Sequence, residues 1–253
     1  MRRRLIPALA LGLTALLTGC GTDTDSPAGA APSPSSTASS AAVDPVAAIT
    51  GSLARSVREP VRMDVTMGVG GQSLRLEAAV DPATEEMTVE MSGPESFTLI
   101  VSKDAVYLKD ETEDDAWMKL DRARLKPGGP LSQGLDIESQ AGILGGVVSA
   151  QPAGDGRYTG IADLHKAAAA AGSDDQRESL GSIAKLVKQP SAVPFEASID
   201  AEGRLTALSY TVDMPTGSMK TEMTLHSFGE PVTITPPPAS QTEDAPDSSY
   251  AFF

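Results

Sequence analysis

From residue 61 to residue 91 the chain alternates apolar and polar side chains with a period of two. Every second side chain of a β-strand points to the same face, so this period predicts strands with one apolar face. Turn residues at Gly70–Gly71 and Asp81–Pro82 separate three such runs, which predicts an antiparallel meander. The apolar positions are Val61, Met63, Val65, Met67, Val69, Leu74, Leu76, Ala78, Val80, Met87, Val89 and Met91.

Other segments extend this sheet or break it. The alternation returns at residues 97–101, 106–108, 117–120, 195–200, 205–213 and 219–228. Helical spacing of apolar residues is found at 45–57, after the N-cap Asp44, and at 174–188, and stretches rich in Ala, Gly and Leu at 131–150 and 161–171 also predict helices. We therefore predict an α+β fold in which helices pack against one face of an antiparallel β-sheet.

The first twenty residues have the charge order and length of a secretion signal. Three arginines are followed by the apolar run Leu5–Leu17, which is too short to span a bilayer core of roughly 30 Å. The stretch Leu17-Thr-Gly-Cys20 resembles the bacterial lipobox, in which a diacylglycerol is attached to the cysteine and the signal is cut before it. We expect residues 1–19 to be removed and Cys20 to carry the lipid.

Cysteine content and charge narrow the classes of function. Cys20 is the sole cysteine, which excludes an internal disulfide and a cysteine-based metal site. The signal removes three of the 20 basic residues, leaving 17 against 34 acidic residues and a net charge of −17. Such a surface repels nucleic acid and anionic head groups, so nucleic acid is not an expected partner. We expect the lipid on Cys20 alone to hold the protein at the membrane.

The composition also divides the chain into segments. Residues 20–43 are Ser, Thr, Ala, Pro and Gly with almost nothing to bury, which predicts a disordered tether. Residues 44–235 have the size of one domain. Residues 236–253 are again poor in core residues, and we expect a disordered C-terminal tail.

Four passages resemble one lipoprotein family. They are Trp117-Met-Lys-Leu-Asp121, Tyr158-Thr-Gly-Ile-Ala-Asp-Leu164, Pro194-Phe-Glu-Ala-Ser-Ile-Asp-Ala-Glu-Gly-Arg-Leu205 and Phe228-Gly-Glu-Pro-Val-Thr-Ile-Thr-Pro236. The residues in these passages, and the order of the passages along the chain, are similar to those of the actinobacterial lipoproteins LppX, LprA, LprF and LprG. The resemblance implies a curved half-barrel sheet with helices on its concave face, as in the LolA and LolB carriers, around an apolar cavity that holds acylated lipids in some members. Around Phe195 many relatives have a Trp, so neither the shape of a cavity nor its ligand carries over.

Residues that could perform catalysis or bind a metal are sparse. Ser182 and Lys185 match the S-x-x-K pattern of penicillin-recognising enzymes, but the partner motifs S-D-N and K-T-G are missing. His165 and His226 are the only histidines, which is too few for a zinc site. The acidic run at 110–115 lacks the spacing and glycine of a calcium loop. We therefore expect no enzyme activity, no metal and no cofactor.

The apolar face of the predicted sheet is the remaining candidate site. Its methionines are flexible and polarizable, which suits a surface that adapts to varied apolar partners. The candidate cavity residues are Met63, Val65, Met67, Leu76, Met87, Val89, Met91, Leu99 and Met223. They could line a cavity that holds a lipid or another apolar ligand between sheet and helices, or they could form an ordinary filled core. The first reading predicts a membrane-anchored, extracytoplasmic carrier or binding protein, and the second a noncatalytic cell-envelope interaction module.

Overall fold

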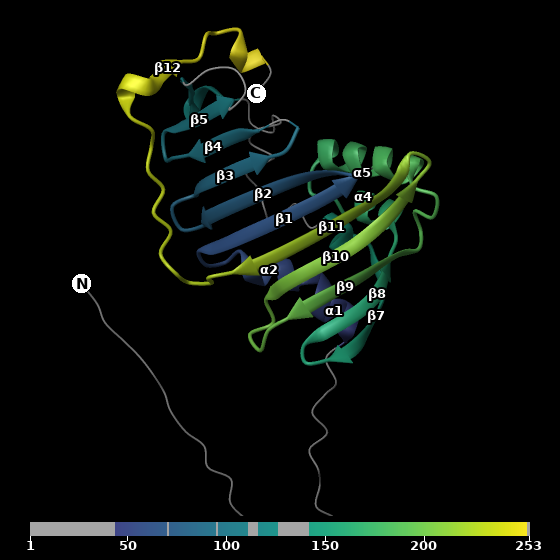
Figure 1. Cartoon of the computed structure of the whole chain (residues 1–253). Helices are drawn as coiled ribbons and strands as arrows, with labels where there is room; N and C mark the ends of the chain where they lie inside the picture. Colours follow the sequence, from purple (N-terminus) through teal and green to yellow (C-terminus); the bar gives the residue numbers. More distant parts are fainter. Residues whose placement is uncertain (1–43, 70, 95, 111–115, 126–141, 252–253) are drawn as a thin grey trace, which may run out of the picture. The chain divides into compact units, whose positions relative to one another are not determined.

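The computed structural model describes residues 44–69, 71–94, 96–110, 116–125 and 142–251 (Figure 1). These residues belong to a compact unit that starts at Ala42. Cys20, the predicted signal, the predicted tether and most of the acidic run at 110–115 lie outside the described residues.

The described residues form a sheet of 12 strands, in the order β12-β6-β5-β4-β3-β2-β1-β11-β10-β9-β8-β7. Neighbouring strands are antiparallel except for β12 and β6, which are parallel. The strands are β1 (Val61–Val69), β2 (Gln72–Asp81), β3 (Glu86–Ser92), β4 (Phe97–Val101), β5 (Ala105–Asp110), β6 (Trp117–Asp121), β7 (Val147–Gly154), β8 (Arg157–Ala162), β9 (Val193–Ile199), β10 (Leu205–Met214), β11 (Gly217–His226) and β12 (Thr242–Asp244). The predicted antiparallel sheet is confirmed.

Two meanders make up most of this sheet. Strands β1 to β6 follow one another in space as in sequence, and so do β7 to β11. The pairing of β1 with β11 joins them, with Met63 opposite Leu225 and Val65 opposite Met223. Because this pair connects distant parts of the chain, the local alternation of the sequence could not predict it.

Short helices begin at side-chain caps. Helix α1 (Pro45–Thr50) starts at Asp44, whose carboxylate accepts a hydrogen bond from the Val46 amide at 3.0 Å. Gly51 separates α1 from α2 (Ser52–Ser56), so the predicted helix at 45–57 is present in two pieces. Helix α5 (Asp174–Leu186) starts at Ser173 and matches its prediction closely. Among the described residues, no helix combines the length and hydrophobicity needed to cross a bilayer.

The structure differs from the helices predicted at 131–150 and 161–171. Residues 131–141 lie outside the described ranges, and residues 142–146 form the 3-10 helix η2 (Gly142–Gly146). Strands β7 and β8 follow, and α4 (Leu164–Ala169) is the helix that remains. Pairing between β7 and β8, and between β8 and β9, satisfies the backbone, and this tertiary context overrides helix propensity.

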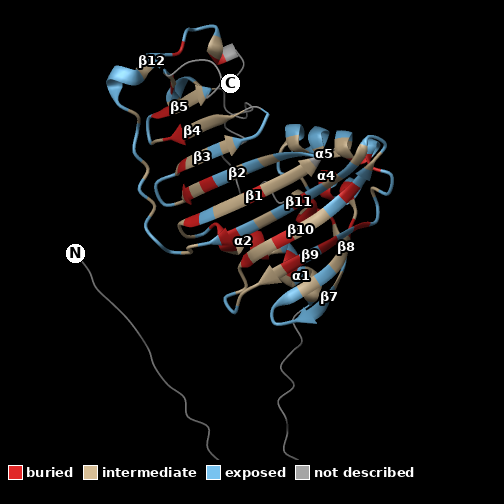
Figure 2. Ribbon diagram, viewed as in Figure 1, coloured by how far each residue is buried: buried red, intermediate tan, exposed pale blue. Residues whose placement is uncertain are grey.

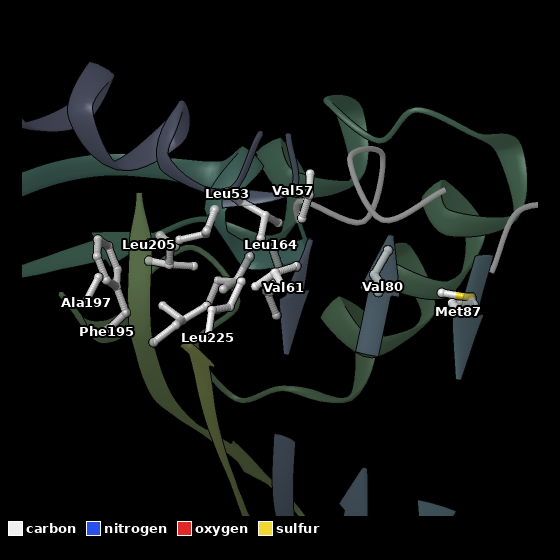
Figure 3. Close-up of a cluster of buried hydrophobic side chains, with 14 of the residues drawn as sticks. Leu53, Val57, Val61, Val80, Met87, Leu164, Phe195, Ala197, Leu205 and Leu225 are labelled. Atoms are coloured by element: carbon white, nitrogen blue, oxygen red, sulfur yellow. The ribbon is translucent and has the colours of Figure 1, made fainter. Parts of the chain in front are cut away.

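The hydrophobic core lies between the helices and the apolar face of the sheet (Figure 3). Leu53 of α2, the following Val57, and Leu164 of α4 are buried together with the sheet residues Val61 and Leu205. Helix α1 contacts β7, and α2 contacts β10. The helices therefore pack against the face that the sequence predicted to be apolar.

The C-terminal residues differ from the predicted disordered tail. Strand β12 pairs with the outer edge of β6, and the Ala245 amide donates to the Lys119 carbonyl at 2.8 Å. The side chain of Tyr250 is 9% exposed, and its hydroxyl accepts a hydrogen bond from the Asp121 amide at 2.8 Å. The Arg124 guanidinium packs over the Tyr250 ring at 3.9 Å. Backbone pairing and the Tyr250 side chain hold this segment in place. Because neither requires many apolar residues, the composition of the segment did not indicate that it is ordered.

Candidate functional site

The strand register places all nine candidate cavity residues on the same face of the sheet. Residues directly opposite each other on paired strands point to the same face. One row runs across the sheet from Met63 through Ala78 and Val89 to Leu99. A second row contains Met223, Val65, Leu76 and Met91, and Met67 and Met87 continue the same face along their strands.

Burial divides this face into two zones. A filled row contains Val61, Val80, Met87, Val101, Val106 and Leu120, each of which is at most 8% exposed. Beside it lies a set of half-buried apolar residues that we call the apolar band: Met63, Met67, Leu74, Leu76, Val89, Met91, Phe97, Leu99, Leu108 and Met223. Figure 2 shows stretches of intermediate burial along these strands. Seven of the nine candidate residues belong to the apolar band, whereas Val65 and Met87 are buried.

The far half of the same face is more deeply buried. Phe195 on β9, Leu208 and Val212 on β10 are 2%, 5% and 2% exposed. The contacts of α1 with β7, of η2 with β8 and of α2 with β10 all fall on this half. The apolar band therefore lies across β1 to β5 and the adjacent edge of β11, beside the half of the sheet that these helices cover.

Thr221 on β11 is a residue of this face that the sequence analysis missed. Its side chain is 4% exposed, and its hydroxyl has no hydrogen-bond partner among the described residues. Met67 of the apolar band lies opposite on β1, and Tyr210 lies opposite on β10. A signal was present in the sequence, since Thr221 is the one polar residue in the alternating series Met219, Thr221, Met223, Leu225.

The residues considered for catalysis are all exposed. Ser182 and Lys185 are both exposed on α5. The His226 ring lies 3.0 Å from the Asp64 carboxylate, and both side chains belong to the polar positions of β11 and β1. His165 is exposed near the start of α4. Within the described ranges, no group of His, Cys, Asp or Glu side chains is arranged to hold a metal ion.

One ion cluster fixes the β9–β10 turn against the segment after α2. The Arg204 guanidinium contacts Asp200 at 2.7 Å and Glu59 at 2.6 Å, and it stacks on the Phe228 ring at 4.3 Å. Burial alone would raise the pKa of Asp200. Hydrogen bonds from the Arg204 amide and guanidinium, together with the positive charge of Arg204, outweigh this effect and hold the pKa of Asp200 below its ordinary value. The cluster therefore joins the turn to the segment after α2 through Arg204.

Two further surface hollows carry charged residues in their linings. A groove of about 750 Å³ beside the C-terminal segment is lined by charged residues that include Lys103, Asp104 and Lys119. A hollow of about 350 Å³ lies over β8 to β11, and its lining mixes charged residues such as Glu196 and Glu222 with apolar residues that include Leu208 and Met223. Charged linings of this kind do not suit an acyl chain, because desolvating them is costly.

No family model matches the chain. No curated protein matches it either. Solved structures with similarity include the Mycobacterium tuberculosis lipoprotein LppX, at 18% identity and a TM-score of 0.42, over 75% of this chain and 97% of that chain. An uncharacterized conserved protein from Thermus thermophilus matches at 11% identity and a TM-score of 0.37, over 78% and 97%. A hypothetical protein from Chlamydia trachomatis matches at 12% identity and a TM-score of 0.30, over 72% and 93%. Similarities at this level do not indicate a shared function.

Proposed function

We propose that this chain is a lipoprotein, anchored through lipid on Cys20 at the extracytoplasmic face of the cell membrane, that binds or carries an apolar ligand. The ligand is an acyl chain or a molecule of similar character, held on the apolar band beside the half of the sheet that the helices cover. The proposal includes the half-barrel curvature, with the helices on the concave face, that the resemblance to LppX and its relatives implies. It assigns no catalytic step to the protein.

The incomplete burial of the apolar band is the observation that carries this proposal. Protein interiors are close-packed, so a filled core buries its side chains as fully as the neighbouring row from Val61 to Leu120. The apolar band instead leaves three methionines of β1 and β3, Met63, Met67 and Met91, partly accessible on a face that is otherwise core. Burying an alkyl chain there yields ~0.8 kcal/mol per methylene, so a long chain would bind without any charged contact.

The alternative is a noncatalytic cell-envelope interaction module whose core is filled. It is favoured by the deep burial of Val65 and Met87, two residues that we expected to line the cavity. In that case the exposed acidic surface, and not the apolar band, would contact a protein partner. The two functions differ in one measurable respect, which is whether the purified protein carries lipid.

Native mass spectrometry of the purified full chain, followed by organic extraction, tests the proposal. We expect additional mass from a noncovalently bound lipid that extraction releases and identifies. Met91→Asp should lose this mass, because it places a charge in the apolar band. Ser92→Asp is the matched control, since the neighbouring residue on β3 is exposed and points to the opposite face. A wild-type protein without extractable ligand, stable and unable to take up acyl lipid, would favour the interaction module.

A further inference from the structure

The buried hydroxyl of Thr221 lies among mostly apolar side chains and makes no hydrogen bond to the described residues. On the same face and strand it is flanked by Met219 and Met223, and its cross-strand neighbours are Met67 and Tyr210. A thioether sulfur is only a weak acceptor. Among the described residues no hydrogen-bond partner reaches the Thr221 hydroxyl.

An orphaned polar group of this kind calls for an explanation. Buried side-chain polar atoms in native proteins are nearly always hydrogen-bonded to protein, water or ligand. Valine has almost the same shape, suits a β-strand and carries no polar atom, so it would fill the position without this cost. The hydroxyl is therefore expected to have a partner that is not part of the described chain.

The position of Thr221 indicates where such a partner would come from. Its neighbours Met67 and Met223 belong to the apolar band, whereas Leu208 and Val212 on the next strand are buried. Thr221 thus lies at the border between the accessible and the filled parts of the apolar face. A ligand on the apolar band would extend to this border, and an oxygen atom on it could meet the hydroxyl.

We propose that the Thr221 hydroxyl hydrogen-bonds an oxygen function of the ligand, so that the apolar band selects acyl lipids that carry an ester carbonyl over plain hydrocarbons. This inference rests on the proposed function, because it names a contact within the same site. The apolar band supplies affinity without direction, and Thr221 supplies the single directional contact that fixes the ligand along it.

Two fluorescent probes of equal chain length test this contact on the full chain stripped of bound lipid. One is a pyrene-labelled fatty acid methyl ester, and the other is the corresponding pyrene-labelled alkane. Thr221→Val should weaken binding of the ester roughly fivefold, as expected for one neutral hydrogen bond, and leave binding of the alkane unchanged. Thr221→Ser should restore ester binding. Thr224→Val is the matched control, because Thr224 is exposed and lies on the opposite face of β11.

A spectroscopic measurement separates a direct contact from a structural effect. With a ¹³C-labelled ester carbonyl, the infrared stretch of the bound probe should lie at lower frequency in the wild type than in Thr221→Val. Thr221→Val should keep or raise the thermal midpoint, since it removes an unsatisfied buried hydroxyl. Equal binding of ester and alkane by wild type and Thr221→Val would overturn the inference while leaving the proposed function intact. Failure of the wild type to bind either probe would overturn both.

Discussion

Replacing Val89 by tryptophan distinguishes an accessible apolar band from a filled core. Val89 is half-buried on β3, with Ala78 and Leu99 opposite it on the neighbouring strands. Val101 on β4 faces the same side but is only 1% exposed, within the filled row. Overpacking a close-packed site typically costs about 1–3 kcal/mol, which lowers the midpoint of a domain of this size by roughly 2–12 °C. We expect this fall for Val101→Trp and a nearly unchanged midpoint for Val89→Trp.

The assay combines calorimetry with binding of a fluorescent fatty acyl probe to protein stripped of lipid. Val89→Trp should lose probe binding, because the indole fills the space that the acyl chain would occupy. Thr88→Trp, one residue away on the opposite face of β3, should retain both the midpoint and the binding. If Val89→Trp lowers the midpoint as much as Val101→Trp and the wild type binds no probe, the apolar band is ordinary core and the interaction module becomes the better account.

Further predictions concern the anchor, the acid limit of stability and the C-terminal segment. Cys20→Ala should abolish incorporation of labelled palmitate without unfolding the domain, and a variant that still incorporates label would contradict the anchoring proposal. Asp200, whose pKa is lowered in the fold, contributes stability above its ordinary pKa of about 4 and loses it as pH falls through the lower folded value. In Asp200→Asn the free energy of unfolding should therefore fall less steeply as the pH is lowered below about 4. The same pH dependence in the wild type and in Asp200→Asn would refute this. Tyr250→Phe removes the acceptor of the Asp121 amide and should cost about 1 kcal/mol. Hydrogen exchange should then speed up in β12, and unchanged protection there would show that Tyr250 does not anchor it.

Local sequence patterns were sufficient for much of the fold. The period of two, broken at Gly71 and at Asp81–Pro82, predicted β1 to β3 and their common apolar face, because strand periodicity and turn chemistry depend on neighbouring residues. The helix cap at Asp44 was equally local. Placing the methionines of β1, β3 and β11 on one face followed from the same parity and is confirmed by the register.

Only the tertiary structure decided which strands meet at a distance and which apolar side chains are buried. The pairing of β1 with β11 and of β12 with β6 joins segments far apart in the chain, and backbone hydrogen bonds carry no residue code that reveals such partners. Val65 and Val89 have the same parity in the sequence, yet the first is buried and the second is only half-buried. Burial depends on what packs above a side chain, so neither the border of the apolar band nor the orphaned hydroxyl of Thr221 could be predicted from the pattern alone.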